Sequence, residues 1–333
     1  MTALEVKHLS KTFSAGGPVR RARLHAVDDV SFALEPGRIT ALAGESGSGK
    51  STVARLLLRL YDPTSGEILF DGKDVTTDTR RKDVLHYRSQ VQMVFQDPFG
   101  SLNPAKTIRS HIERPLRIHG IVPNDQIEER VLSLLEEVGL VPAEVVADKY
   151  PHQLSGGQRQ RVAIARALAV EPRVLIADEP ISMLDVSIRV GILNLMLKLK
   201  EQGIAFLYVT HDLASARYVA DDILVMYAGQ VVERGPVEDV LENPLHPYTQ
   251  LLLASVPDGS KALERIEIRR GTASAAVDPP AGCRFVNRCP LAIDVCRRVT
   301  PELVEARPQQ AARCHVTAPA TDIREGLHAE SAA

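Results

Sequence analysis

One short segment constrains the fold of this chain more than any other. Residues 44–51 read Gly-Glu-Ser-Gly-Ser-Gly-Lys-Ser, which fits the phosphate-binding pattern G-x-x-x-x-G-K-[ST]. The apolar run at 39–43 reads as a buried strand, and residues 50–60 have the periodicity of a helix. This order supports phosphate binding, because the pattern works at a turn between a strand and a helix. The candidate nucleotide ligands here are Gly44, Ser46, Gly47, Ser48, Gly49, Lys50, Ser51 and Thr52.

The residue types of this loop predict how it binds ATP. Glycines let backbone N–H groups curl around phosphate oxygens, and the N-terminus of the following helix adds positive potential. Lys50 is expected to reach the β- and γ-phosphates, and the Ser51 hydroxyl is expected to bind Mg²⁺. A merely flexible Gly/Ser loop is a weaker interpretation, because it would not need the strand and the helix. A dinucleotide fingerprint would need glycine where Thr52 stands.

A second apolar strand ends in two carboxylates. Residues 174–177 are all apolar and are followed by Asp178 and Glu179. Open α/β sheets place ligands at strand ends, so Asp178 is expected to hold Mg²⁺. Glu179 is placed to activate the attacking water as general base. Alone, this pair would be an ordinary acidic strand end; together with the phosphate loop it predicts a site of ATP hydrolysis.

The alternation of apolar strands with helical patterns predicts an α/β fold with a largely parallel sheet. A third strand is expected at 205–210, and amphipathic helices are expected at 126–138 and 158–169. A loop signal at 257–260 is followed by a change in composition. We therefore expect an ATPase domain over residues 1–257 and a small extension over 258–333.

Residues 154–158, Leu-Ser-Gly-Gly-Gln, lie between the phosphate loop and the acidic pair, and here the chain resembles the ABC ATPase family. The pentapeptide looks like the family signature, and the other motifs follow in the family's order. The resemblance implies a P-loop ABC ATPase domain with a helical subdomain, in which Ser155, Gly156, Gly157 and Gln158 contact nucleotide. It further implies that Phe13 stacks on adenine, Gln96 contacts Mg²⁺ and water, Asp185 lies in a loop crossing a dimer interface, and His211 senses the γ-phosphate.

The signature supports a two-subunit site on physical grounds as well. Residues 155–157 are expected to open a helix, so their N–H groups and the helix dipole would bind an anion. The chain already has a phosphate loop for its own ATP. A second anion cradle makes sense if it caps the γ-phosphate bound by another subunit. This implies a head-to-tail dimer with two ATP molecules at the interface, whose closure could drive a permease.

Four further segments narrow the resemblance to the ATPases of dipeptide/oligopeptide importers, most closely their F-type subunit. These are residues 14–25, 96–104, 243–249 and 279–283. The resemblance implies a second ABC ATPase subunit, identical or different, two transmembrane permease subunits and, indirectly, an extracytoplasmic substrate-binding protein. Importers of nickel, glutathione and oligosaccharides share these features, so other substrates stay open. A soluble ABC ATPase of translation or DNA repair and a non-catalytic regulatory module are rival functions, disfavoured by the single phosphate loop and the intact catalytic residues.

Residues 96–104 and the helical stretch after them are expected to contact the permease. Phe95, Phe99 and Leu102 are candidate apolar anchors beside Gln96, although core packing is the alternative for each. Such a contact would connect the chemistry at Gln96 with movement of the permease.

Composition restricts where the chain works. Of its 333 residues, 44% are hydrophobic and 25% are charged, as in a soluble globular protein. The first ten residues have no signal-peptide core, and no apolar run is long enough to span a bilayer. The formal net charge of -2 gives no support to a nucleic-acid partner. We therefore expect a peripheral protein on the cytoplasmic face of the membrane.

The cysteines gather in one segment, with the spacing C-x5-C-x6-C-x17-C. A reducing compartment disfavours disulfides, and the spacing lacks the paired C-x2-C of structural zinc sites. Four thiolates suit a [4Fe–4S] cluster, and the resemblance to peptide-importer ATPases favours it; structural zinc and unligated thiols are the alternatives. Arginines at 284, 288, 297, 298 and 313 would offset the charge of such a cluster. The predicted ligands are Cys283, Cys289, Cys296 and Cys314.

Overall fold

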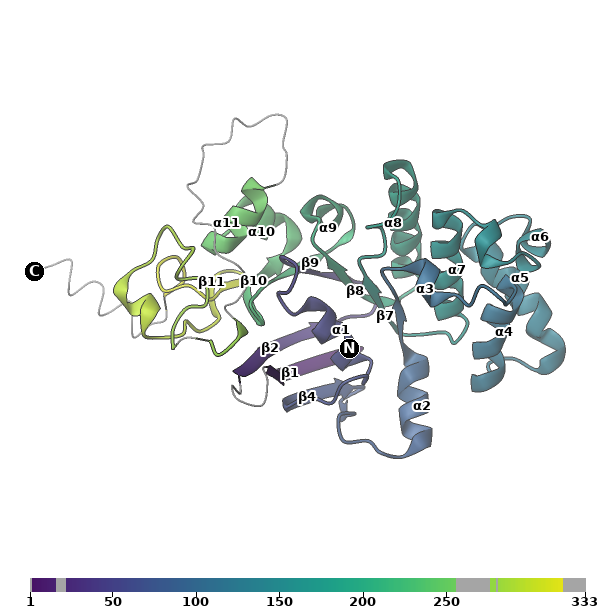
Figure 1. The fold of residues 1–333 in the computed structure, drawn as a ribbon, viewed down its shortest axis with the longest axis horizontal. Helices are drawn as coiled ribbons and strands as arrows, with labels where there is room; N and C mark the ends of the chain where they lie inside the picture. The colour runs from purple at the N-terminus through teal and green to yellow at the C-terminus, as the bar shows by residue number, and fades with distance from the viewer. Residues whose placement is uncertain (1, 16–21, 256–275, 280, 320–333) are drawn as a thin grey trace, which may run out of the picture.

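The computed structural model describes residues 2–15, 22–255, 276–279 and 281–319. Within them lies an eight-stranded sheet of order β11-β12-β10-β9-β3-β8-β7-β6 (Figure 1). The expected strands at 39–43, 174–177 and 205–210 are confirmed, and so is the α/β fold with a largely parallel sheet. The parallel strands are β3 (Ile39–Ala43), β6 (Val91–Val94), β7 (Val174–Asp178), β8 (Ala205–Thr210) and β9 (Asp222–Tyr227).

The parallel strands are buried on both faces because alternate side chains enter two separate cores. Ile39, Phe206 and Tyr208 belong to one core. Leu42 and Leu207 belong to the other. Burying a side chain of this size stabilises the fold by about 2 kcal/mol. The strand ends that carry the predicted site therefore rest on a rigid support.

The chain returns to this sheet after residue 276. Strand β10 (Gln230–Pro236) runs antiparallel to β9, and β12 (Gln310–Ala312) and β11 (Val304–Arg307) add to it in turn. The domain boundary expected near 257 lies outside the described residues. The division into 1–257 and 258–333 therefore stays a prediction.

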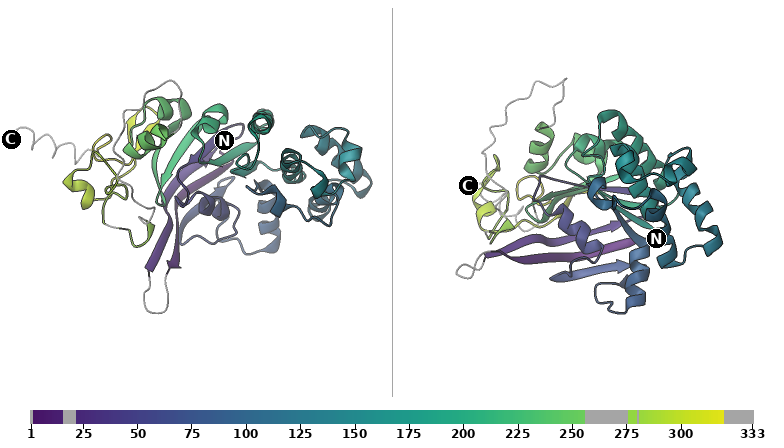
Figure 2. Two further views of the ribbon diagram at one scale, coloured as in Figure 1. Left: turned by 45° about the horizontal axis from the view of Figure 1, so that its top comes forward. Right: turned by 45° about the vertical axis from the view of Figure 1, so that its right-hand side comes forward.

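A second, antiparallel sheet has the order β2-β1-β4-β5. Its strands β1 and β2 form the long hairpin visible in Figure 2. Their sequence pattern did not reveal this sheet, because buried and exposed positions in β2 do not alternate strictly. The bounds are β1 (Leu4–Ala15), β2 (Ala22–Leu34), β4 (Ser65–Phe70) and β5 (Lys73–Asp74).

A group of helices at the end of the molecule opposite β11 forms the predicted helical subdomain (Figure 1). It consists of α4 (Ile108–His119), α5 (Ile127–Glu137), α6 (Ala143–Ala147) and α7 (Gly156–Leu168). In the described ranges no helix is long and apolar enough to cross a bilayer. The remaining α-helices are α1 (Lys50–Leu57), α2 (Arg81–Gln90), α3 (Pro98–Ser101), α8 (Val186–Glu201), α9 (Leu213–Val219), α10 (Val237–Glu242) and α11 (Pro247–Ala254). Short 3-10 helices cover Asn124–Gln126, Pro151–Gln153 and Asp294–Arg297.

Candidate nucleotide site

The phosphate-binding loop connects β3 to α1, as predicted, and it requires glycine at two positions. Gly49 has φ 109°, and a Cβ added there would lie 2.1 Å from the carbonyl oxygen of Ala26 in β2. Gly44 has φ 151°, and its added Cβ would lie 2.2 Å from the carbonyl oxygen of Met226 in β9. Other residues fit neither the backbone angle nor the space. Contacts with two strands thus fix the shape of the loop.

Lys50 opens α1 with its ammonium group turned back to the loop. Its Nζ donates to the carbonyl oxygens of Gly44 at 2.7 Å and Glu45 at 2.9 Å, and the residue is only 6% exposed. Burial lowers the pKa of Lys50, while nearby carboxylates, Glu179 first among them, act in the opposite direction. A buried cation held by carbonyl oxygens is placed to bind a phosphate that enters the loop.

Three residues predicted from separate parts of the chain come together, two of them contacting the carboxylate of the third, Glu179. Gln96 Nε2 donates to Glu179 Oε2 at 2.9 Å, and His211 Nδ1 lies 3.1 Å from Glu179 Oε1. They follow β6, β7 and β8, whose carboxyl ends are neighbours in the sheet. Glu179 has φ 46°, a left-handed conformation that costs a non-glycine residue about 1 kcal/mol. Its N–H donates to the carbonyl oxygen of Val209 at 2.9 Å, which helps to hold that conformation.

Asp178 and Ser51 lie beside this group. Ser51 Oγ donates to Asp178 Oδ1 at 3.5 Å, and Asp178 is 9% exposed. Burial raises the pKa of Asp178, and the hydrogen bond from Ser51 lowers it. Oxygen ligands of this kind are those that Mg²⁺ prefers. The oxygen atoms of Asp178, Ser51 and Gln96 are therefore suitable ligands for the predicted Mg²⁺.

A cavity of about 740 Å³ lies over the phosphate loop and Glu179, and Asp178 is not among its lining residues. Four of its lining residues were not predicted: Glu45 in the loop itself, and three apolar residues, Leu24 and Ala26 of β2 and Leu252 of α11. In the sequence the three apolar residues carry no signal that separates a ligand contact from core packing. Its other lining residues are all predicted ones: Gly44, Ser46, Gly47, Gly49, Lys50, Ser51, Thr52, Gln96, Glu179 and His211.

Two predicted nucleotide ligands, Phe13 and Ser48, do not line this cavity. Ser48 is buried in the loop and does not line the cavity. Phe13 on β1 is also absent from the lining; its ring packs edge-on against Tyr61, with centroids 5.5 Å apart, and Lys11 Nζ lies 5.2 Å from its centroid. The structure therefore does not bring Phe13 to the cavity, and its stacking on adenine stays a prediction.

The signature segment, residues 154–158, opens a helix as expected, but it lies away from the cavity above the phosphate loop. Ser155 caps α7: its Oγ accepts the N–H of Gln158 at 3.2 Å, and Gln158 Oε1 accepts the N–H of Ser155 at 3.0 Å. A Cβ added at Gly157 would lie 2.4 Å from Ile188 of α8. Asp185 precedes that helix, so it belongs to the signature's surroundings. Residues 155–158 and Asp185 do not line the cavity above the phosphate loop.

The chain matches two protein families in separate regions. The ABC transporter family matches residues 27–182, and the family described as the oligopeptide/dipeptide transporter C-terminal region matches residues 232–296. The oligopeptide transport ATP-binding protein AppF of Bacillus subtilis is 44% identical over 323 residues, 95% of this chain and 97% of that protein. The chain belongs to the ABC transporter ATP-binding proteins of the oligopeptide/dipeptide family.

Another relative and a solved structure agree with this family. The di/tripeptide transport ATP-binding protein DppF of Pseudomonas aeruginosa is 43% identical and covers 94% of this chain and 97% of its own length. The ATP-binding cassette MJ0796, solved as a dimer in a post-hydrolysis state with ADP and Pi, has a TM-score of 0.62 and 33% identity. Their match covers 70% of this chain and 98% of that one. The predicted family, its fold and its enzyme class, an ATPase, are confirmed.

In this ABC ATPase, arginines beside three of the cysteines anchor the C-terminal extension. They were expected to offset the charge of a metal cluster, but each pairs with a carboxylate of the preceding domain. The three arginine side chains are at most 11% exposed, whereas their carboxylate partners are between 31% and 47% exposed. The pairs are Arg284 with Asp28, Arg288 with Glu45, and Arg313 with Asp29.

The segment 243–249, noted for its resemblance to peptide-importer ATPases, fastens the same extension to β10. Glu233 is fully buried and accepts the N–H groups of Leu245 at 2.8 Å and His246 at 2.9 Å. It also accepts the amide of Gln310 in β12 at 2.9 Å. Burial lowers the pKa of His246 to about 3, so this histidine stays neutral. Its role is structural.

The four cysteines are free thiols, and Cys283 is close enough to the other three to feel their charge. Burial is the main cause that raises the pKa of Cys283 to about 12, and the other three cysteines act in the same direction. Yet no group of three or more His, Cys, Asp or Glu side chains in the described ranges is arranged to hold a metal ion. The predicted four-cysteine ligand set is therefore not present as a preformed metal site.

Proposed function

We propose that this chain is the ATP-hydrolysing subunit of an importer of dipeptides or oligopeptides, bound to its permease on the cytoplasmic face of the membrane. The convergence of Gln96 and His211 on the Glu179 carboxylate, beside the phosphate loop, carries this proposal. The printed names of AppF and DppF, for oligopeptide and di/tripeptide transport, support the substrate class.

Binding of ATP is assigned to the loop and its neighbours. Lys50 and the N–H groups of the loop bind the β- and γ-phosphates. Ser51, Asp178 and Gln96 would hold Mg²⁺, which supplies positive charge to the phosphate oxygens.

Hydrolysis is assigned to Glu179 and the two side chains bound to it. Glu179 accepts a proton from water while the water oxygen attacks the γ-phosphorus and the bond to the oxygen of ADP breaks. Gln96 and His211 each contact one oxygen of this carboxylate and so hold its orientation. His211 is also assigned to contact the γ-phosphate.

A second ABC ATPase subunit is the proposed partner across the ATP. The capped start of α7 offers N–H groups to an anion outside the chain's own cavity. Beside it, Met183 and Val186 are 56% and 75% exposed, which suits a surface that another subunit covers. The solved dimer of MJ0796 supports such an arrangement.

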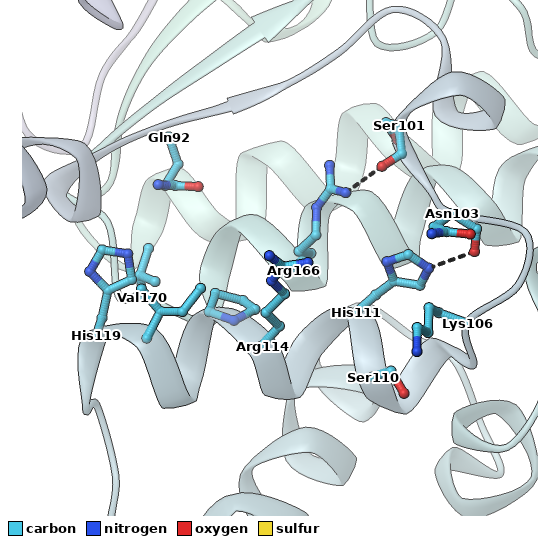
Figure 3. Close-up of a pocket in the computed structure, with 12 residues that line it drawn as sticks. Gln92, Ser101, Asn103, Lys106, Ser110, His111, Arg114, His119, Arg166 and Val170 are labelled. Carbon is cyan, nitrogen blue, oxygen red and sulfur yellow. Dashed lines mark hydrogen bonds between the residues drawn. The ribbon is translucent and has the colours of Figure 1, made fainter.

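A second cavity, of about 640 Å³, supports a contact with the permease. Figure 3 shows His111 and Arg114 on α4 facing Arg166 of α7 across it. Arg166 Nη1 donates to the carbonyl oxygen of Ser101 at 2.5 Å, which ties α7 to α3. The described lining includes Lys106 and these arginines and has no carboxylate, so it suits a permease loop that carries an acidic side chain.

This second cavity, called the groove below, is connected to the catalytic carboxylate of Glu179 by a short stretch of sequence. Gln96 contacts Glu179, and Ser101, five residues later, lines the groove. Phe95 is 42% exposed and can serve as an apolar anchor, whereas Leu102 is 2% exposed and belongs to the core, so that proposed anchor is wrong. The side chain of Phe99 lies outside what the structure describes.

A photo-reactive side chain at position 101 should cross-link to a co-expressed permease subunit. The matched control is position 82, where Lys82 is exposed on α2, away from the groove lining. Arg114→Glu should weaken assembly, because it places a carboxylate against the acidic permease loop. Equal cross-linking from positions 82 and 101 in a functional complex would contradict the contact.

The function itself is tested in vesicles that contain the chain, its permease and the external binding protein. We expect peptide uptake that requires ATP, with ATP hydrolysis stimulated by the same peptides. Stimulation by nickel, glutathione or an oligosaccharide in place of peptides would reject the substrate class and keep the motor role.

For the predicted extension, we propose a structural [4Fe–4S] cluster. Backbone N–H groups of Phe285, Leu291 and Thr317 hydrogen-bond to three of the cysteine sulfurs. Such donors favour thiolates and tune clusters. The thiols would have to close around the cluster, because they do not form a metal site beforehand. The proposed ligands are Cys283, Cys289, Cys296 and Cys314.

Anaerobically purified protein should be brown and contain iron and sulfide at about four each per chain. Cys296→Ser should lower both contents and the melting temperature, since that thiol is buried. A colourless, zinc-loaded and fully folded protein from the same handling would overturn the cluster.

A further inference from the structure

Glu45, in the phosphate-binding loop, is held by residues far from it in the chain. Its N–H donates to the Tyr248 hydroxyl of α11 at 2.8 Å. Its two carboxylate oxygens accept hydrogen bonds from Arg288 Nη1 and Nη2, each at 2.9 Å. Its carbonyl oxygen accepts Lys50 Nζ at 2.9 Å. The residue that positions the phosphate-binding lysine is thus itself positioned by the C-terminal part of the chain.

Arg288 is rigidly placed for this pairing. Its side chain is 11% exposed, and its guanidinium lies 5.7 Å from the ring centroid of Tyr227 and 5.6 Å from that of Phe285. The rings of Tyr227, Tyr248 and Phe285 contact one another, with centroids between 4.6 and 5.6 Å apart. A two-pronged arginine–carboxylate pair on an aromatic base has little freedom to move.

The charge of Glu45 explains why this pairing matters. Glu45 lines the cavity above the loop, where the polyphosphate of ATP would lie. An unpaired carboxylate there would repel phosphate. Arg288 neutralises this carboxylate and fixes its position.

We infer that Arg288 is a positioning residue of the nucleotide site, which acts through Glu45. The inference rests on the proposed nucleotide site and extends it to the C-terminal segment. It makes Arg288 part of the machinery that binds nucleotide, beyond its role as an anchor. A purely structural Arg288 would change the amount of folded protein and leave the affinity of the folded fraction unchanged.

The test measures the dissociation constant and stoichiometry of ADP binding in the full chain, so that hydrolysis does not intervene. Arg288→Ala should weaken ADP binding about tenfold with unchanged stoichiometry, since it exposes the phosphates to an uncompensated charge. Arg288→Lys should recover part of the loss. The matched control Arg298→Ala, an exposed arginine of the same segment, should bind like the parent.

The deciding variant combines Arg288→Ala with Glu45→Gln. It should bind ADP more tightly than Arg288→Ala alone, because the repelling charge has been removed. Damage to the cysteine segment cannot produce this recovery, since Glu45 lies in the phosphate loop. Unchanged affinity in Arg288→Ala, or a double variant weaker than the single one, would overturn the inference. Failure of the parent chain to bind ADP would instead reject the proposed nucleotide site.

Discussion

Lys50→Ala should reduce ATP hydrolysis by at least about 100-fold, because the phosphates lose their main cationic contact. Lys50 is buried, and its ammonium group is already held at the mouth of the loop by two backbone carbonyls. It therefore does not need to be ordered when ATP binds. The rate is measured in the assembled transporter with saturating peptide.

Lys82→Ala is the control for a general loss of positive charge, since Lys82 is exposed on α2. It should hydrolyse ATP like the parent. Because Lys50 also bonds the loop, thermal unfolding of both variants shows that the loss concerns the site and not the fold. Undiminished turnover of Lys50→Ala would refute the assignment of the loop.

Glu179→Gln should retain ATP binding and lose hydrolysis by roughly 100-fold or more, the usual contribution of a general base. The amide keeps the size of the side chain and can still bond Gln96 and His211, but it cannot accept the proton of water. Because ATP then persists between the subunits, the variant should accumulate as an ATP-bound dimer. Light scattering with and without ATP measures that dimer.

Glu171→Gln is a closely matched control, because Glu171 is an exposed glutamate that also has a left-handed backbone, with φ 53°. It pairs with Arg130 away from the cavity lining. Its hydrolysis and its oligomeric state should equal those of the parent. A Glu179→Gln variant that turns over at the parent rate would show that another group is the base.

The sequence predicted the site correctly where one local structural motif accounts for several adjacent residues. The loop at 44–51 needs its glycines, lysine and serine within one turn, and the signature needs Ser155 and Gln158 three residues apart to cap a helix. Each motif is complete within a few residues, so its sequence pattern could be recognised. The roles of Gln96 and His211 came from family resemblance, because their meeting at Glu179 depends on the order of β6, β7 and β8.

Contacts between distant residues could not be predicted in the same way. Arg288 and Glu45 are 243 positions apart, and neither has a pattern that names the other. Arginines beside cysteines suggested compensation of a cluster's charge, and only the fold shows that three of them neutralise carboxylates. Leu24 and Leu252 reach the cavity from β2 and α11, and an apolar residue carries no mark of that position.

The two short C-terminal strands have a further consequence for the solubility of the protein. In β12, Ala311 and Ala312 pair with Arg234 and Glu233 of β10, and Arg313 N–H donates to the carbonyl oxygen of Val232 at 2.8 Å. Without the extension, this row of N–H and C=O groups would face water at an open sheet edge. Open edges recruit strands of other molecules, and short edges do so less readily. The extension replaces the seven-residue edge of β10 with the four-residue edge of β11. An ATPase cut at residue 257 would therefore expose the longer edge and should aggregate more readily.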